Sequence, residues 1–271
     1  MLIDPVWETK VRAFAARLRK ATSYELPNGT PPVFERARSW LTAQPLSPRL
    51  AKLSQKGSDE KAHFAVLKNG AWPTGNLHLA LIRCQYHRDR VAAYVQAVHE
   101  CIDPELVSHL DRGALGIGHG NKLCLHFEYQ AFIMAARTSL DYLARTVNAY
   151  FGNQGNSFND LPAALEKARP RDIAKELSAV VAPFYDGLSH FYGTGQKKSV
   201  RDLISHYYFV PAAHLNLRAD GAVLFGGGEG LNGEPLVDVL DRHFALITQT
   251  VVETLTRLID LDQPPGSVSQ L

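Results

Sequence analysis

Apolar residues recur every three or four positions along two long segments, and this spacing predicts two long helices. The first covers residues 126–151, and the second runs from residue 234 or 235 to residue 259. Their apolar positions are Phe132, Ala136, Leu140, Leu143, Val147 and Tyr150, then Leu236, Leu240, Phe244, Ile247, Val251, Leu255 and Leu258. A sustained stripe of this period is typical of helices packed in a bundle. Gly152 and Asn153 are expected to end the first helix.

Shorter helical patterns surround these two segments. A helix is predicted over residues 161–190 and is expected to break near Pro170 and Pro183, because proline lacks the backbone donor that a helix interior needs. Residues 44–61 are polar and contain prolines, so they are expected to form a surface connection. The other predicted helices cover residues 5–21, 33–43, 75–100 and 200–208, with a further helical turn or two at 103–112.

Two segments carry strand signals. Residues 212–226 alternate apolar and polar positions around Ala219-Asp220-Gly221, which predicts a β-hairpin before the last helix. Leu115–Ile117 and Leu123–Leu125 flank His119-Gly120-Asn121 and predict a second, smaller hairpin. The expected fold is therefore mainly α, a four-helix bundle with a β-hairpin insert before its last helix.

The chain is expected to divide into three parts. Residues 1–113 form a mostly helical N-terminal region without an assigned role, residues 114–262 form the bundle, and residues 263–271 form a flexible tail. The segment 75–100 also carries basic residues, which form either a solvated face or the edge of a groove that contacts phosphate. These are Arg83, His87, Arg88 and Arg90.

Composition narrows the classes of protein. Apolar residues make up 45% of the 271 positions and the net charge is +2, which suits a globular protein without bulk affinity for nucleic acid. The three cysteines include no CxxC pair, so a reducing compartment is expected. The N-terminus does not resemble a signal peptide, and no segment reaches the roughly 18 apolar residues that span a bilayer. We therefore expect a cytoplasmic protein without a membrane partner.

One short motif carries candidate chemistry. Arg201, Asp202 and His206 lie at the start of a predicted helix that Ser199 can cap. An arginine, four intervening residues and a histidine, in a bundle of helices, resemble the HEPN superfamily of ribonucleases. The segment from Glu128 to Arg145 also resembles the first helix of such domains. The resemblance covers roughly residues 120–260 and implies a HEPN-like bundle.

The pair Arg201 and His206 suits cleavage of RNA by its own 2′-hydroxyl. Imidazole titrates near neutral pH and can move the proton, while a guanidinium fork matches the charged phosphate oxygens. Neither a metal nor another cofactor is required. Positions five apart on a helix point about 140° away from each other. One copy therefore does not present both side chains on one face. The family resemblance implies a homodimer, in which the motifs of two copies line one shared cleft.

Other residues are candidates for supporting roles around the motif. Asp202 could orient Arg201, and so could Glu128 or Asp141 on the long helix, although each is also an ordinary surface charge. Tyr207 could stack on a base or pack in the core. Two further candidates, for attracting the RNA backbone, are Lys197 and Lys198.

The first hypothesis is a metal-independent endoribonuclease, which the resemblance implies to be a toxin or phage-defence effector. Its expected partners are RNA, a second copy of the chain, and an antitoxin or regulatory protein. The alternative is a catalytically silent HEPN-like scaffold, in which Arg201 pairs with Asp202 and His206 is half-buried. A third, weaker option is a nucleotide-binding or nucleotide-transferring partner in a two-gene toxin system. The histidines show no HExxH pattern, which argues against a metal site.

Overall fold

The computed structural model describes most of the chain after residue 28. The described ranges are 29–65, 67, 76–100, 114–116, 123–153, 155, 157–193, 198–206, 214–218, 223–226 and 234–262. The chain divides into two compact units, residues 1–30 and 31–271, and nearly all of the described residues belong to the second. The helix predicted at 5–21, the turns predicted at 103–112 and the tail 263–271 lie outside the described residues.

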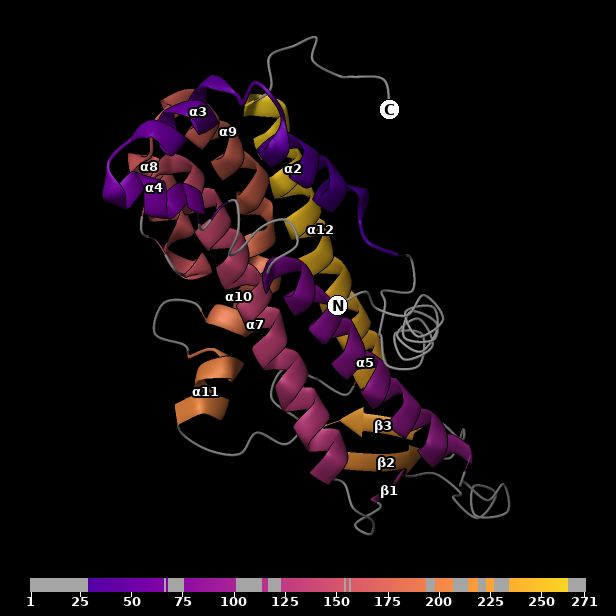
Figure 1. Cartoon of the computed structure of the whole chain (residues 1–271). Helices are drawn as coiled ribbons and strands as arrows, with labels where there is room; N and C mark the ends of the chain where they lie inside the picture. The colour runs from indigo at the N-terminus through magenta and orange to yellow at the C-terminus, as the bar shows by residue number, and fades with distance from the viewer. Residues whose placement is uncertain are drawn as a thin grey trace, which may run out of the picture. The chain divides into compact units, whose positions relative to one another are not determined.

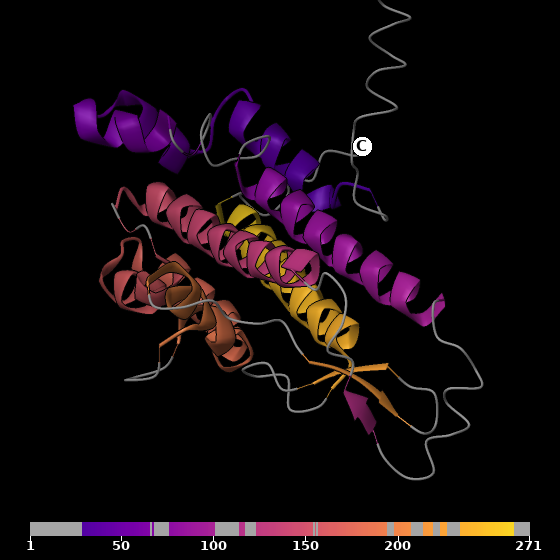
Figure 2. The same cartoon turned by 90° about the horizontal axis from the view of Figure 1, so that it is seen from below.

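The described part of the chain is mainly helical, as the sequence predicts, and three long helices run side by side at its centre. They are α5 (Asn76–Glu100), α7 (Leu123–Phe151) and α12 (Leu236–Asp262), and α5 runs in the opposite direction to the other two (Figure 1, Figure 2). The group α8 (Leu161–Lys167), α9 (Arg171–Val181) and α10 (Tyr185–Tyr192) packs against α7 and α12. No helix in the described part of the chain combines the length and apolar content needed to cross a membrane.

The segment expected to be a surface connection is helical, and that prediction is wrong. Among the described residues, α5 is preceded by the helices α2 (Pro32–Thr42), α3 (Pro48–Gln55) and α4 (Ser58–Ala65). The hydroxyl of Ser47 caps α3 by accepting the backbone N–H of Leu50 at 3.2 Å. Leu50 and Leu53, one turn apart, are fully buried. The cap and the burial of this apolar pair stabilise α3 even though the surrounding residues are mostly polar.

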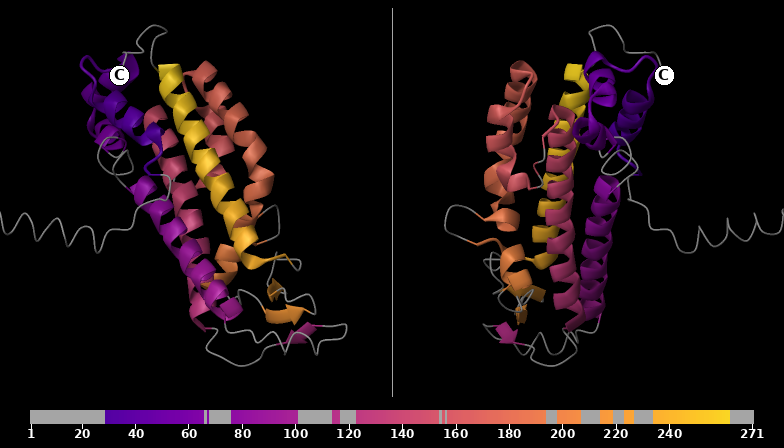
Figure 3. Two further views of the ribbon diagram at one scale, coloured as in Figure 1. Left: turned by 90° about the vertical axis from the view of Figure 1, so that its right-hand side faces the viewer. Right: turned by 60° about the vertical axis from the view of Figure 1, so that its left-hand side comes forward.

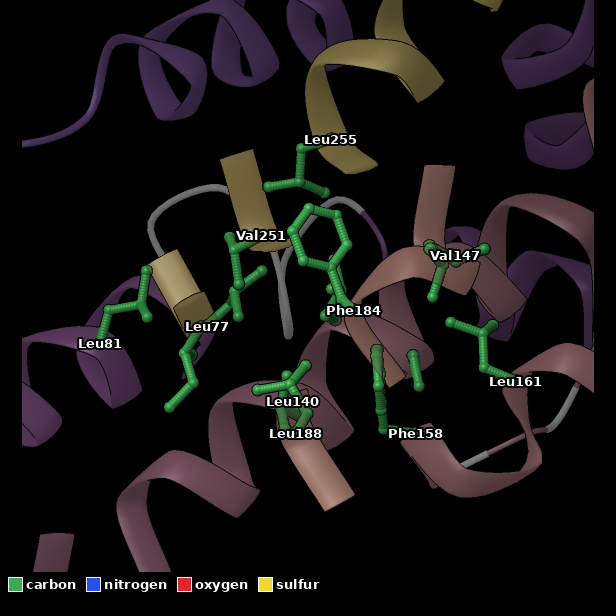
Figure 4. Close-up of a cluster of buried hydrophobic side chains, with 14 of the residues drawn as sticks. Leu77, Leu81, Leu140, Val147, Phe158, Leu161, Phe184, Leu188, Val251 and Leu255 are labelled. Atoms are coloured by element: carbon green, nitrogen blue, oxygen red, sulfur yellow. The ribbon is translucent and has the colours of Figure 1, made fainter. Parts of the chain in front are cut away.

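One hydrophobic core joins elements from both sides of residue 113. Leu77 and Leu81 of α5 lie in the same buried cluster as Leu140 of α7 and Val251 of α12 (Figure 4). The sequence suggests a division at 113, whereas the described residues on its two sides share this core. The physical reason is that α5 carries apolar side chains, which are buried by packing along α7 and against α12.

Glycine and proline end the helices where the sequence predicts. Gly152 has a φ of +75°, and its N–H and that of Asn153 bond back to the carbonyls of Ala149 and Asn148, which closes α7 with a Schellman motif. The predicted helix over 161–190 is interrupted, because α8 ends before Pro170 and a 3₁₀ turn containing Pro183 separates α9 from α10.

Three short strands lie where α7 and α12 begin (Figure 1, Figure 3). β1 (Ala114–Gly116) and β3 (Val223–Gly226) each pair antiparallel with β2 (His214–Arg218), which is central. The register places Leu115 opposite Leu217 and Leu215 opposite Phe225. The smaller hairpin predicted with Leu123–Leu125 is wrong, because those residues form the first turn of α7 and β1 pairs with β2 instead.

Candidate functional site

The motif lies on a short helix, α11 (Val200–His206), which packs against α7 and α10 (Figure 1). Ser199 precedes it, and its hydroxyl accepts the backbone N–H of Asp202 at 3.0 Å. The predicted cap of this helix is therefore confirmed. Because Ser199 is buried, the cap fixes the first turn of α11, which carries Arg201, against the rest of the bundle.

Arg201 and Asp202 form an ion pair at the surface. The Nη1 of Arg201 donates to the Oδ1 of Asp202 at 3.0 Å, and the two side chains are 34% and 39% exposed. Burial raises the pKa of Asp202, but hydrogen bonds from Ser199 and Arg201 outweigh it, so the pKa lies below its ordinary value. Asp202 is therefore ionised near neutral pH, and Arg201 remains accessible to a ligand.

The structure describes the other motif residues only in part. His206 ends α11, and its side chain, together with Tyr207 and Lys197, lies outside the described residues. Lys198 is exposed just before the cap. The convergence of His206 with Arg201 therefore stays a prediction.

Glu128 lies on α7, and its described partners are on α5. Its carboxylate meets the Nδ1 of His87 at 2.6 Å and the Nε of Arg90 at 3.7 Å. The structure thus places Glu128 in a contact between α7 and the antiparallel helix α5, not with Arg201. Its proposed part in orienting Arg201 finds no support in these contacts.

Asp141 also forms its described hydrogen bonds with residues other than Arg201. One carboxylate oxygen accepts the Nε of Arg137 at 3.2 Å, and the other accepts the backbone N–H of Phe158 at 3.0 Å. Asp141 therefore holds the start of the 3₁₀ turn Phe158–Asp160 against α7 and has no described contact with Arg201. Arg137 is the residue on α7 that sequence reasoning missed, and its spacing of four from Asp141 was the available signal.

The basic face of α5 is largely neutralised by acidic residues. The guanidinium of Arg88 makes a two-pronged contact with Asp241 of α12, its Nη2 donating to Oδ2 at 2.7 Å, and its Nη1 donates to Asp89 at 2.8 Å. With His87 and Arg90 paired to Glu128, these contacts join α5 to α7 and α12. Of the two readings of this face, the contacts favour a structural one over a phosphate-binding edge.

Two histidines stack between α10 and α12. The rings of His190 and His243 lie 5.0 Å apart and 27° from parallel, with the hydroxyl of Tyr129 3.5 Å from the Nε2 of His190. The helices approach closely because Gly187 lacks a Cβ, which would lie 2.7 Å from the Cδ2 of Leu246. No group of three or more metal-ligating side chains occurs among the described residues, so this pair is read as a packing contact.

Ser199→Ala is expected to weaken α11 locally. The substitution leaves the N–H of Asp202 without its acceptor, and loss of such a cap costs about 1 kcal/mol. Amide hydrogen exchange in residues 200–204 should accelerate about fivefold, whereas exchange in α12 should not change. Equal exchange rates in α11 of the two proteins would show that the cap does not hold this helix.

Comparison of the chain with protein-family models, with curated proteins and with solved structures finds no match in any of the three.

Proposed function

We propose that the chain is a metal-independent endoribonuclease whose bundle is HEPN-like, with Arg201 and His206 as the reactive pair. The observation that carries the proposal is the state of Arg201, which a capped helix turn and an ionised neighbour hold at the surface with a third of its side chain exposed. A preorganised, partly solvated guanidinium suits a phosphate ligand. The motif spacing in the sequence adds His206 as the group that carries a proton.

The proposed reaction needs only these groups and the RNA. The 2′-oxygen bonds to phosphorus, the bond from phosphorus to the 5′-oxygen breaks, and His206 carries the proton from the 2′-hydroxyl to the departing 5′-oxygen. Arg201 stabilises the extra negative charge on the phosphate oxygens in the transition state. The products are a 2′,3′-cyclic phosphate and a 5′-hydroxyl.

The proposed site combines two copies of the chain. Arg201 and His206 lie five positions apart on α11, and ideal helix geometry separates two such positions by about 140° around the axis. A second copy supplies the group that one copy cannot present on the same face. In this proposal the dimer acts on RNA in a toxin or defence role, with an antitoxin or regulatory protein as a further partner.

Cleavage of RNA in the presence of EDTA tests the proposal. Wild type is expected to cut, and Arg201→Ala and His206→Ala are each expected to lose more than about a hundredfold of the rate, because each removes a group that acts in the transition state. Arg257→Ala is the matched control, since this arginine forms an exposed ion pair with Glu176 away from α11. Circular dichroism should show that all four proteins are folded.

Two further results would distinguish this mechanism, attack by the 2′-hydroxyl at a site shared by two copies, from the mechanisms of other nucleases. An RNA with a 2′-deoxy sugar at the cleaved position should resist cutting, because the nucleophile is absent. Mixing Arg201→Ala with His206→Ala should restore part of the activity, because a mixed dimer contains one intact pair. Equal cutting by wild type and both variants would refute the assignment.

The second candidate is a binding scaffold, and the pairing of Arg201 with Asp202 at 3.0 Å favours it. In that case the ion pair is structural, and Arg201→Ala changes the free energy of unfolding of the protein, while RNA is not cleaved by either protein. Folded wild-type protein that fails to cut a pool of random RNA would support this reading.

A further inference from the structure

Two imidazole rings lie in the contact between α10 and α12. His190 of α10 stacks on His243 of α12 with the ring centroids 5.0 Å apart. The ring of Phe191 meets both edge-on, at 5.4 Å and 5.0 Å, and the hydroxyl of Tyr129 on α7 lies 3.5 Å from the Nε2 of His190. The two histidines are therefore enclosed by α7, α10 and α12, and the packing of α10 on α12 at this point depends on their remaining in contact.

This enclosure is unfavourable for a proton on His243. Protonation turns both ring nitrogens into donors, and the Nδ1 of His243 is buried with no hydrogen-bond partner among the described residues. A charged donor in that position would lack an acceptor, which is costly in a protein interior. Protonation of both rings would also place two positive charges 5.0 Å apart, where like charges repel. Separation of the rings removes both penalties, because water then reaches the nitrogens.

The neighbouring charges add to this penalty. Arg242, next to His243 on α12, pairs with Glu234 at 2.7 Å, and both Arg242 and His190 disfavour a charge on His243. Asp186 lies one turn before His190 on α10, so it favours a proton on His190 whether α10 is packed on α12 or separated from it. The charge of Asp186 therefore does not hold the contact closed in acid.

The other elements packed against α10 and α12 carry charges that are paired with one another. The 3₁₀ turn Ala182–Phe184 has no titratable side chain, and Tyr129 is the titratable group that faces His190 from α7. The ion pairs on the remaining elements are Arg201–Asp202, Arg88–Asp241, His87–Glu128, Arg137–Asp141, Arg257–Glu176 and Arg36–Asp260. In the described part of the chain, these carboxylates are thus engaged by side chains other than His243.

We infer that His190 and His243 form a pH-sensitive contact, in which neutral rings hold α10 on α12 and protonation favours a minority state with α10 separated from α12. Helix α10 is the element expected to move, because it has 8 residues, whereas α12 has 27 and also packs against α2, α5, α7 and α9. A proton that only the open state binds readily raises the population of that state as the pH falls.

Amide hydrogen exchange of the full chain at pH 7.5 and pH 5.0 tests the inference. In water an imidazole has its ordinary pKa of 6.5, whereas in the closed contact the pKa of His243 is about 3. The open state therefore gains about thirtyfold in relative population between the two pH values. Protection factors in residues 189–192, corrected for the intrinsic effect of pH on exchange, should fall by the same factor.

Urea distinguishes this local opening from unfolding of the whole chain. At pH 5.0 the protection factors of α10 should be at least about tenfold lower than those of α7, and they should hardly change up to about 1 M urea, because a local opening exposes little surface. Those of α7 should decrease with urea, since they report global unfolding. Equal protection factors and an equal urea dependence in α7 and α10 would overturn the inference, because the histidines would then act only through global unfolding.

Variants at position 243 test the role of the ring itself. In His243→Phe the protection factors of α10 should fall less than about threefold between pH 7.5 and pH 5.0, because position 243 no longer binds a proton. His243→Gln, which is also uncharged, serves if His243→Phe does not fold. His78→Phe is the control and should keep the thirtyfold fall, since His78 stacks on Phe34 in the contact between α5 and α2. A thirtyfold fall that persists in both variants of His243 would overturn the inference.

The same experiment reports on the helix that carries the motif. Helix α11 packs against both α10 and α7, so separation of α10 removes one of its two described supports. Protection factors in residues 203–205 should therefore decline with those of α10 in wild type and remain unchanged in His243→Phe. Constant protection of α11 while that of α10 falls would overturn the extension of this contact to the motif. None of these measurements uses RNA, so they are decided separately from the proposed function.

Discussion

Asp262→Ala is expected to lower the free energy of unfolding by about 3 kcal/mol. The carboxylate of Asp262, at the end of α12, accepts the indole N–H of Trp40 at 2.7 Å and the hydroxyl of Tyr150 at 2.8 Å. Trp40 belongs to α2 and Tyr150 to α7, and both residues are almost fully buried. The substitution removes the carboxylate that both buried donors share, and a buried donor that loses its acceptor costs about 1–3 kcal/mol.

Urea unfolding followed by circular dichroism measures this loss. Asp260→Ala is the matched control, because Asp260 pairs with Arg36 on the surface, where both side chains are nearly half exposed. The control is expected to change stability by less than about 0.5 kcal/mol. Asp262→Asn should fall between the two, since its amide oxygen still accepts one of the two donors. Equal losses in the free energy of unfolding for Asp260→Ala and Asp262→Ala would contradict the role of Asp262 as the acceptor for Trp40 and Tyr150.

Tyr150 provides an independent readout of the same contact. Burial raises the pKa of the Tyr150 hydroxyl, and the negative charge of Asp262 raises it further. Removing the carboxylate should therefore shift the titration of this hydroxyl to lower pH, which ultraviolet absorbance can follow. No shift would mean that the charge of Asp262 does not reach Tyr150.

The helices could be predicted because their signals are local. The apolar stripe of α7, the glycine that closes it and the serine that caps α11 each depend on residues within a few positions. Helices α3 and α4 were missed because they are short and polar, so that Leu50 and Leu53 stand alone as signals. Burial of these two leucines follows from the packing of distant elements, which a local pattern does not encode.

The partners of the charged residues could not be predicted in the same way. His87 meets Glu128 across 41 positions, and Arg88 meets Asp241 across 153, because the helices cross at those points. Sequence spacing places each charge on a helix but does not set how two helices are rotated against each other. For that reason the sequence could offer Glu128 and Asp141 only as candidates for orienting Arg201 or as surface charges, and their described contacts are with other residues.

His243 is expected to make the folded chain less stable in acid, and His243→Phe is expected to remove this contribution. Burial first, and then the neighbouring charges of His190 and Arg242, lower the pKa of His243 from its ordinary 6.5 to about 3. Above pH 6.5 neither the folded nor the unfolded chain protonates this group. Below it, the unfolded chain binds a proton that the folded chain refuses until about pH 3.

The size of the effect follows from the shift in pKa. Each unit is worth about 1.4 kcal/mol, so the free energy of unfolding should fall by roughly 4 kcal/mol between pH 6.5 and pH 3 through this residue alone. Phenylalanine keeps the edge contact with Phe191 at 5.0 Å, and among the described residues the buried Nδ1 of His243 has no hydrogen-bond partner that the substitution would leave unsatisfied. His243→Phe should therefore match wild type at pH 7.5 and exceed it increasingly as the pH falls.

Thermal unfolding at a series of pH values between 7.5 and 4 measures the difference between the two proteins. His78→Phe is the control, because burial also lowers the pKa of His78, but the negative charge of Glu35 opposes that shift. This control should gain much less stability in acid than His243→Phe. Parallel curves for wild type and His243→Phe would mean that His243 takes up its proton in the folded chain as readily as in the unfolded one. The stacked pair of α10 and α12 would then have to open toward water, contrary to the packing around Gly187 and Leu246.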